Sequence, residues 1–288
     1  MSRRVLIQLD CDPQPSTFDA IVAVDAGVDV VLRHGAVTAE NVVPLVHGAM
    51  FTRGGAELAA TAIFVGGSDV AAAEAVFARV RATFFGPVRV GVLLDPSGAN
   101  TTAAAAVIAA ARHLPCAAGG EGVVLGGTGP VGQRVARLLA RRGVAVTLVS
   151  RDAGRAAATV AGIRRAVPGA AIEPAGVAEL VGAGADGALA RAQLVVAAGA
   201  AGACLLTAEQ RRALAATVCI DLNAVPPAGI EGIAPTDKAR ADGAALLYGA
   251  LGVGSTKMKI HRAAIARLFA ADAPALDADE LLALGDTL

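Results

Sequence analysis

The chain has 288 residues, 55% of them hydrophobic, which excludes a disordered chain and a small disulfide-stabilised scaffold. Its 25 basic residues balance its 25 acidic residues, so no overall charge favours nucleic acid or an anionic membrane as a partner. Aromatic residues make up only 3% of the chain and glycine is abundant, which indicates close packing between elements with small side chains.

Short β-branched runs alternate with Ala-rich stretches along the chain, as expected for parallel strands covered by helices. In the first third, strands are predicted at 4–9, 62–66 and 88–94, and helices at 18–26, 39–47 and 69–84. Thr38 and Ser68 precede the last two helices as N-caps. A helix over 101–113 then leads into the breaker stretch 114–120.

A second alternation begins at residue 122, with strands predicted at 122–126, 144–150, 194–198 and 218–222. Beyond it, the glycines of 249–254 predict a loop, followed by a helix over 256–269 and a capped acidic helix from Asp277.

These elements predict the α/β fold class, with a Rossmann-type doubly wound parallel sheet and a second α/β domain. We assign residues 114–249 to the Rossmann domain and residues 1–113 to the second domain, which 250–288 complete. A chain that leaves a domain and returns to it forms two lobes. We therefore expect an interdomain cleft in which a ligand binds.

A glycine motif follows the apolar run 123–125: Gly127, Thr128, Gly129, Pro130, Val131, Gly132. This G-x-G-x-x-G opens a predicted helix over 131–141, which is the strand-turn-helix context of a dinucleotide site. Gly127 permits a tight turn, Gly129 lets backbone N–H groups approach a pyrophosphate, and Gly132 allows close helix packing. An ordinary glycine-rich turn is the alternative.

The end of the next predicted strand selects the dinucleotide. It ends in Ser150 and Arg151, with Arg155 about one helical turn further on. Guanidinium groups bind phosphate, so this pattern favours NADP, with NAD as the alternative because Asp152 lies close enough to contact a ribose hydroxyl. The arginines can also be solvated charges at a helix start.

Two later loops are expected to complete the cofactor pocket, because ligands bind at the carboxyl ends of strands in a doubly wound sheet. They contribute Ala198 and Gly199 after one strand and Asn223 after another. Glycine and proline also end strands with no ligand nearby.

Polar residues that could contact a substrate form three groups. They are Asp10, Asp12, Phe18 and Asp19; Asp95, Asn100, Thr101 and Thr102; and Lys257, Lys259 and His261. In a helix, Lys257 and His261 share one face at i, i+4. A surface lysine and a packed histidine are the alternatives.

No residue pattern indicates a catalytic acid or base. The single tyrosine, Tyr248, lacks a lysine four residues later, so the Tyr-x-x-x-Lys proton relay of short-chain reductases is absent. This absence favours a hydride transfer whose product is a delocalised cation and whose chemistry needs no proton transfer.

Several blocks together resemble the bacterial NAD(P)-dependent methylene-tetrahydromethanopterin dehydrogenases. They are FTRGG at 51–55, TAIFVGG at 61–67, NTTAAA at 100–105, GTGPVG at 127–132, GALG at 249–252 and K-x-K-x-H-R at 257–262. The blocks span nearly the whole chain, and most lie outside the generic nucleotide motif.

The resemblance implies an oxidoreductase of one-carbon (formaldehyde) metabolism that transfers a hydride from methylene-tetrahydromethanopterin to NADP or NAD, giving the methenyl form. It places Phe18, Thr102, Lys257 and His261 at the pterin, to which we add Asp19 and Asn100 from their positions in the sequence. It also implies a homo-oligomer, a trimer or hexamer. The alternatives are a methylene-tetrahydrofolate or shikimate-type NADP dehydrogenase and a non-catalytic NADP-sensing module.

The four cysteines, at 11, 116, 204 and 219, are far apart and have no zinc-ligand spacing. We therefore expect free thiols, no metal and a reducing compartment. No secretory signal is recognised at the N-terminus, and the Ala-rich stretch 99–118 contains Arg112, His113 and Pro115. The sequence predicts a cytoplasmic protein with no membrane partner.

Overall fold

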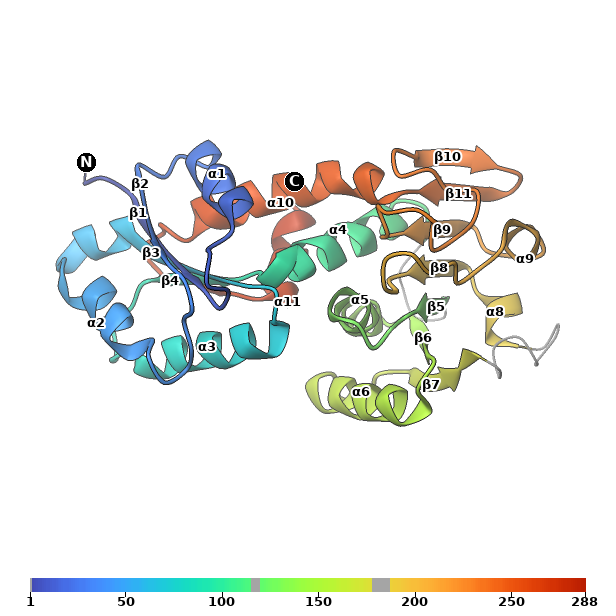
Figure 1. Ribbon diagram of the computed structural model, residues 1–288, viewed down its shortest axis with the longest axis horizontal. Helices are drawn as coiled ribbons and strands as arrows, with labels where there is room; N and C mark the ends of the chain where they lie inside the picture. The colour runs from blue at the N-terminus through green and yellow to red at the C-terminus, as the bar shows by residue number, and fades with distance from the viewer. Residues whose placement is uncertain (1, 115–119, 178–186) are drawn as a thin grey trace. The chain divides into compact units, whose positions relative to one another are not determined.

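A computed structural model describes residues 2–114, 120–177 and 187–288 (Figure 1). The chain forms two compact units, Met1–Thr101 with Met258–Leu288, and Thr102–Lys257. The division falls inside two helices, α4 (Ala99–Ala111) and α10 (Ala250–Arg267), whereas the sequence-based limits lie at 113/114 and 249/250. The interdomain cleft stays a prediction.

The first unit contains a parallel five-stranded sheet in the order β12-β4-β3-β1-β2. Its strands are β1 (Val5–Asp10), β2 (Val30–His34), β3 (Thr61–Gly66), β4 (Gly91–Leu94) and β12 (Ala275–Leu276). Its helices are α1 (Thr17–Asp25), α2 (Val43–Phe51), α3 (Val70–Thr83) and α11 (Ala278–Gly285), with short 3-10 turns at Gly55–Ala60 and Pro96–Gly98.

Strand alternation gives this sheet two buried faces. Ile7, Ile63 and Val92 lie in a core cluster with residues of α2 and α3, on one face. Phe64 has the opposite parity on β3, and its ring stacks on His261 of α10. Figure 1 shows α2 and α3 on one side of this sheet and α1 on the other. Burial on both faces explains the continuous apolar runs in these strands.

The second unit contains a seven-stranded sheet in the order β10-β11-β9-β8-β5-β6-β7. Its strands are β5 (Glu121–Leu125), β6 (Ala145–Ser150), β7 (Ile172–Gly176), β8 (Leu194–Ala197), β9 (Val218–Asp221), β10 (Lys238–Asp242) and β11 (Ala245–Tyr248). All neighbours pair in parallel except β10 with β11. The strand order reverses between β5 and β8, where doubly wound sheets bind ligands. The predicted α/β Rossmann-type class is confirmed.

Helices lie on both faces of this sheet (Figure 1). They are α5 (Pro130–Arg141), α6 (Ala153–Ala166), α8 (Ala188–Arg191) and α9 (Ala208–Arg212). The face that carries α8 and α9 encloses a core cluster that includes Val123, Val195 and Cys219.

Most predicted elements are confirmed within a few residues, but both N-cap predictions were wrong. Asp69 caps α3 by accepting a hydrogen bond from the Ala72 N–H, while Ser68 donates its hydroxyl proton to Asp12. The Thr38 hydroxyl accepts from the Glu40 N–H in a turn, and α2 begins only at Val43.

The predicted loop over 249–254 was also wrong, because α10 begins at Ala250 and Gly249 directly precedes it. A Cβ on Gly249 would lie 2.0 Å from the Ala234 carbonyl oxygen, and one on Gly252 would lie 1.8 Å from that of Asp237. Glycine is therefore required here for close approach of a helix to a neighbouring turn, despite its low helix propensity.

None of the helices that the structure describes is both long enough and apolar enough to cross a lipid bilayer.

Candidate functional site

The glycine motif forms the turn between β5 and α5, as predicted. A Cβ on Gly132 would lie 2.7 Å from the Gly126 carbonyl oxygen, and one on Gly127 would lie 2.5 Å from Leu148 Cγ. A Cβ on Gly129 would meet nothing nearer than 3.5 Å. Gly127 and Gly132 are thus needed for close packing, whereas Gly129 leaves the entrance of the turn free of side-chain atoms.

The first turn of α5 presents backbone donors. Gly129 is the N-cap and no side chain accepts a hydrogen bond from this turn, while Pro130 at the helix start has no N–H to lose. The N–H groups of Val131 and Gly132 belong to the part of a helix that lacks intrahelical partners and carries the positive end of the helix dipole. This arrangement fits a pyrophosphate.

A cavity of about 990 Å³ adjoins this turn and lies entirely within the second unit. Of the predicted cofactor residues, it is lined by Thr128, Gly129, Ser150, Arg151, Arg155, Ala198 and Gly199. The carboxyl ends of β5, β6 and β8 meet here, on both sides of the point where the strand order reverses. Its position and its lining suit a dinucleotide.

The wall after β6 is organised by short hydrogen bonds. The Ser150 and Thr128 hydroxyl oxygens lie 3.3 Å apart, and the Asp152 N–H donates to the Ser150 hydroxyl at 3.2 Å. The Asp152 carboxylate in turn accepts from the Arg155 N–H at 2.9 Å and caps α6. Ser150 therefore links the glycine turn to the start of α6.

Arg151 and Arg155 are exposed and line the cavity. Neither guanidinium has an ion-pair partner among the described parts of the chain. Asp152, the residue that leaves NAD open as an alternative, is occupied with the helix cap. Asp152 caps α6, while the two guanidinium groups have no ion-pair partner in the part of the chain that the structure describes. This arrangement favours a dinucleotide that carries a phosphate beyond its pyrophosphate.

Asn223 does not line the cavity. Its amide donates to the Pro227 carbonyl and its Oδ1 accepts from the Val225 N–H, so the side chain stabilises its own loop. The buried Asp221 carboxylate holds the same loop through the N–H groups of Asn223 and Ile230, and burial raises its pKa. A cofactor contact by Asn223 stays a prediction.

Sequence reasoning missed part of this cavity. Gly126, Cys204 and Gln210 line it as well. Gln210 belongs to α9, whose capping box it forms with Thr207. A five-residue helix after a glycine loop gives no periodic signal in the sequence, so α9 could not be predicted.

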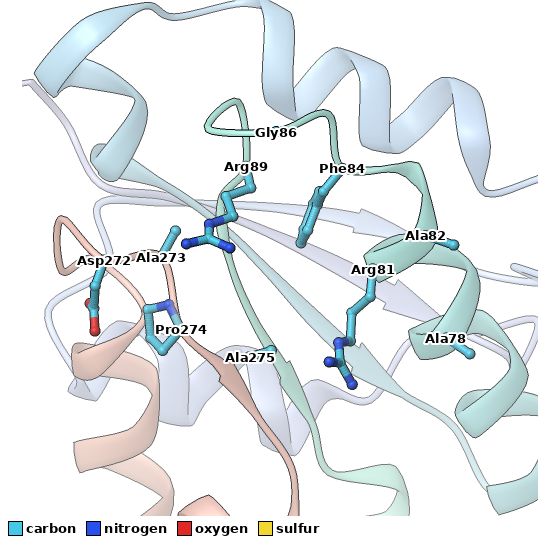
Figure 2. Close-up of a pocket in the computed structure, with 10 residues that line it drawn as sticks. All are labelled: Ala78, Arg81, Ala82, Phe84, Gly86, Arg89, Asp272, Ala273, Pro274 and Ala275. Atoms are coloured by element: carbon cyan, nitrogen blue, oxygen red, sulfur yellow. The ribbon is translucent and has the colours of Figure 1, made fainter.

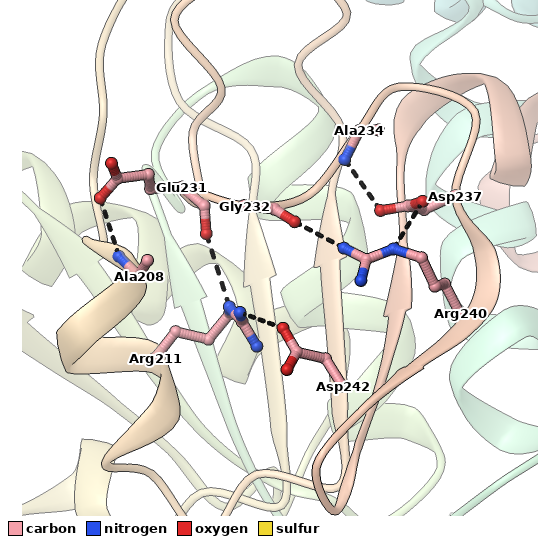
Figure 3. A network of polar contacts seen from close by, with 8 residues as sticks. All are labelled: Ala208, Arg211, Glu231, Gly232, Ala234, Asp237, Arg240 and Asp242. Atoms are coloured by element: carbon pink, nitrogen blue, oxygen red, sulfur yellow. Dashed lines mark hydrogen bonds and ion pairs between the residues drawn. The ribbon is translucent and has the colours of Figure 1, made fainter.

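A polar network fixes α9 against the β10 hairpin (Figure 3). Arg211, only 3% exposed, donates to the Asp242 carboxylate at 2.5 Å and to the Glu231 carbonyl oxygen at 3.4 Å. The bond from Arg211 lowers the pKa of Asp242. Nearby, Arg240 joins Asp237 and the Gly232 carbonyl. These contacts position the wall of the cavity that carries Gln210.

In the first unit, a cluster of rings brings together two predicted substrate residues. His261 is fully buried between the Phe64 ring, at a centroid distance of 5.8 Å, and the Phe18 ring, at 6.3 Å. Phe18 is 51% exposed, so part of its surface is available to a ligand. Because Phe64 lies at the centre of the sheet, it gives the cluster a rigid base.

Asp19 joins the same cluster. It is buried in the first turn of α1, where the Ser16 hydroxyl accepts from its N–H, and its Oδ1 lies 3.9 Å from His261 Nε2. This arrangement places a carboxylate next to the rings. Sequence reasoning named Asp19 and His261 separately but could not predict that they meet.

Lys257 and His261 lie on α10 at i, i+4, as predicted, and Lys257 is half-buried while Lys259 is exposed. Thr102 is half-buried on α4. Substrate contacts of Thr102 and Lys257 stay predictions.

Asn100 has a structural environment. It is fully buried, and its amide donates to the Leu94 carbonyl at 2.6 Å and to the Asp277 carboxylate at 2.9 Å. Its N–H donates to Asp95, which also accepts from the Thr101 hydroxyl. These bonds connect the start of α4 to β4 and to the N-cap of α11. A substrate contact of Asn100 stays a prediction.

A second hollow, of about 700 Å³, lies at the end of α3 (Figure 2). Arg81, Phe84 and Arg89 line it, opposite Asp272, which forms an ion pair with Arg267. None of the predicted site residues contributes to this hollow.

The thiols differ in environment. Burial raises the pKa of Cys219 to about 11, and Cys11 is raised to about 11 by burial and by the neighbouring Asp10 and Asp12. Cys204 is an exposed free thiol in the wall of the cavity. Cys116 lies outside the described residues.

Comparisons with known proteins identify the family. Residues 17–97 match the family described as "Methylene-tetrahydromethanopterin dehydrogenase, N-terminal". The chain is 44% identical to the "Bifunctional protein MdtA" of Methylorubrum extorquens, over 99% of this chain and 98% of that protein. It is 30% identical to the "NAD(P)-dependent methylenetetrahydromethanopterin dehydrogenase" of the same organism, over 95% and 94%.

Among solved structures, quinate dehydrogenase from Corynebacterium glutamicum in complex with NAD is similar in fold, with a TM-score of 0.51 and 16% identity over 99% of both chains. Similarity to two curated relatives over nearly the whole length goes further than a shared fold, because it includes the first unit as well as the glycine turn. The chain therefore belongs to the family of methylene-tetrahydromethanopterin dehydrogenases.

Proposed function

We propose that this enzyme transfers a hydride from the methylene carbon of methylene-tetrahydromethanopterin to NADP⁺, giving the methenyl cation and NADPH, with NAD⁺ as a poorer acceptor. The observation that carries this proposal is similarity over the whole chain to a relative named for this reaction, combined with a glycine turn that opens into a cavity with two unpaired arginines.

The second unit would hold the dinucleotide. The α5 N-terminus and Gly129 face the pyrophosphate, Arg151 and Arg155 bind the 2′-phosphate, and Ala198 with Gly199 leaves room at the nicotinamide end. When bound, the nicotinamide accepts the hydride at C4.

The first unit would hold the pterin. The exposed surface of Phe18 suits stacking with a flat heteroring, and the buried ring of His261 supports Phe18 from behind. The Asp19 carboxylate lies near these rings, where its negative charge favours the cation that forms on the carrier. Thr102 and Lys257 are proposed to bind the pterin edge and an anionic part of the carrier.

No acid or base is needed, because the two nitrogens that flank the methylene carbon share the positive charge left when the hydride departs. The residues named above must mainly hold the two reacting carbons in line. Such positioning lowers a barrier by about 7–11 kcal/mol when donor and acceptor lie ~3–3.5 Å apart. We therefore expect the hydride step itself to depend weakly on pH.

An assay of four pairs separates the alternatives: methylene-tetrahydromethanopterin and methylene-tetrahydrofolate, each with NADP⁺ and NAD⁺. The proposal expects the highest kcat/KM for the methanopterin carrier with NADP⁺. A higher kcat/KM with methylene-tetrahydrofolate would indicate that the folate is the substrate. A bell-shaped pH profile of the hydride step would favour a shikimate-type acid/base pair. Nucleotide binding without turnover of either carrier would favour an NADP-sensing module.

Two further properties are proposed on the family resemblance: a cytoplasmic location and a trimeric or hexameric assembly. On α1, Ile21 and Val24 are exposed apolar residues of the kind that subunit contacts cover. Light scattering of the purified protein tests the assembly, and a monomeric mass at micromolar concentration would contradict it.

A further inference from the structure

Asp152 has two opposing effects on the binding of a phosphate in the cavity. Its Oδ1 accepts from the Arg155 N–H at 2.9 Å, which fixes the start of α6. The same side chain lines the cavity between Arg151 and Arg155. One carboxylate thus holds the backbone of an arginine in place while it adds a negative charge to the cavity wall that also carries Arg151 and Arg155.

The position of this carboxylate is fixed by its surroundings. The Asp152 N–H donates to the Ser150 hydroxyl, which lies 3.3 Å from the Thr128 hydroxyl of the glycine turn. A Cβ on Gly154 would lie 3.3 Å from Asp152 Oδ1, a tight contact that glycine avoids. The carboxylate is therefore held in the cavity wall by its bond to the Arg155 N–H and is not a freely moving surface charge.

We infer that Asp152 is a specificity-determining residue, which positions the arginines for the 2′-phosphate and at the same time weakens that phosphate's binding by repulsion. This inference rests on the proposed function, since it concerns the 2′ end of the same nucleotide. The repulsion acts on the 2′-phosphate of NADP⁺, which NAD⁺ lacks. Asp152 therefore reduces the preference for NADP⁺ over NAD⁺ that the two arginines create, and NAD⁺ stays usable as an acceptor.

The size of the effect follows from Coulomb's law for exposed charges. A carboxylate a few ångströms from a phosphate in water-like surroundings changes affinity by roughly three- to tenfold, and salt screens much of this. Asparagine caps helices about as well as aspartate, so Asp152→Asn removes the charge and retains the cap.

The experiment uses the full chain and two nucleotide fragments, adenosine 2′,5′-bisphosphate and adenosine 5′-monophosphate, with affinities measured by calorimetry at low and high salt. In Asp152→Asn, the preference for the bisphosphate should rise roughly three- to tenfold at low salt and less at high salt, with the monophosphate unchanged. The unchanged monophosphate affinity also shows that the variant is folded.

Asp69→Asn is the matched control, because Asp69 is an exposed N-cap that accepts from the Ala72 N–H at 3.0 Å and lies outside the cavity. It should leave both affinities unchanged. Asp152→Ala removes cap and charge together, so its gain should be smaller than that of Asp152→Asn.

An unchanged or lower preference in Asp152→Asn would overturn the inference. If Asp152→Ala and Asp152→Asn gain equally in preference for the bisphosphate, the positioning role of Asp152 is contradicted and only the repulsion is supported. If the unaltered protein binds neither fragment, the proposed nucleotide site fails, and that result is distinct from the other two.

Discussion

The nucleotide cavity and the ring cluster are built in different ways. Many residues that line the cavity are small, such as Gly129 and Gly199, and they come from the carboxyl ends of β5, β6 and β8 and the turns that follow. The ring cluster brings together Phe18, Phe64 and His261 from α1, β3 and α10, which are far apart in the sequence. A site made from turns is encoded locally, whereas a site made from packed side chains depends on the whole unit.

This difference predicts how each region responds to substitution. In the cavity, the limiting factor is space for the backbone and for the ligand, so an added methyl group has a large effect. In the ring cluster, the limiting factor is the support of one exposed ring by a buried one, so loss of a ring has the large effect.

The largest effect is expected for Gly132→Ala. Its new Cβ would lie 2.7 Å from the Gly126 carbonyl oxygen and 2.8 Å from Gly127 Cα, both backbone atoms. The turn must move, so we expect roughly 1–3 kcal/mol of lost stability and loss of measurable NADP⁺ binding. Denaturant unfolding and calorimetry check both.

Gly129→Ala is the matched control, since its Cβ meets only ordinary contacts at 3.5 Å. It should keep its stability and lose nucleotide affinity alone. Normal NADP⁺ binding in both alanine variants would show that the turn is not the pyrophosphate site.

His261→Ala tests the ring cluster. Removal of the ring leaves a void beneath Phe18, so the KM for methylene-tetrahydromethanopterin should rise by roughly tenfold or more, as expected when about 1.4 kcal/mol of binding is lost. Affinity for NADP⁺ should not change. His261→Phe retains a ring and should recover part of the loss. Equal loss for both ligands would contradict a substrate-side role.

Asn100→Ala separates a structural from a substrate role. The buried Leu94 carbonyl would lose the Asn100 donor, which costs roughly 1–3 kcal/mol, and the half-buried Asp277 carboxylate would lose one of its donors. We expect a lower free energy of unfolding and, in the folded fraction, an unchanged KM for the carrier. Unchanged stability with a raised KM for the carrier would show instead that Asn100 contacts the substrate.

Arg151→Ala tests the 2′ end of the cavity. Loss of a charge-assisted hydrogen bond, worth about 1.5–3 kcal/mol, should raise the KM for NADP⁺ at least tenfold and leave that for NAD⁺ unchanged. An unaltered ratio of the two KM values would remove Arg151 from the phosphate site.

The smallest effect concerns the thiols. A pKa of about 11 leaves buried Cys219 protonated at pH 8, so its alkylation should be slow and should rise only in strongly alkaline solution. Exposed Cys204 should react first, and NADP⁺ should protect it because it lines the cavity. Peptide mapping by mass spectrometry distinguishes the two, and no protection of Cys204 would argue against nucleotide in this cavity.

Much of the second unit could be predicted because its signals are local. The apolar run of β5, the glycines and the Ser150-Arg151 pair lie within thirty residues of one another, and each has a backbone or charge role that sequence reveals. The three central strands of the first unit were predicted for the same reason. The two edge strands were not, because Arg33 interrupts the apolar pattern of β2 and β12 has only two residues.

The missing parts depend on contacts between distant segments. The glycines of 249–254 predict a loop when considered alone, and only the close approach of the Asp237 carbonyl oxygen explains why α10 contains Gly252. The bond from Asn100 to Asp277 joins positions 177 residues apart, so no local pattern in the sequence predicts it. The meeting of Asp19 with His261 has no signature at all in the sequence.

Direct transfer of the hydride is the central claim, and an isotope measurement tests it. Carrier deuterated at its methylene carbon is oxidised by the enzyme with NADP⁺, and the reduced nucleotide is examined by mass spectrometry and NMR. We predict that deuterium appears at C4 of the nicotinamide and not in water. Deuterium released to solvent, or oxidation of the carrier without reduction of the nucleotide, would contradict it.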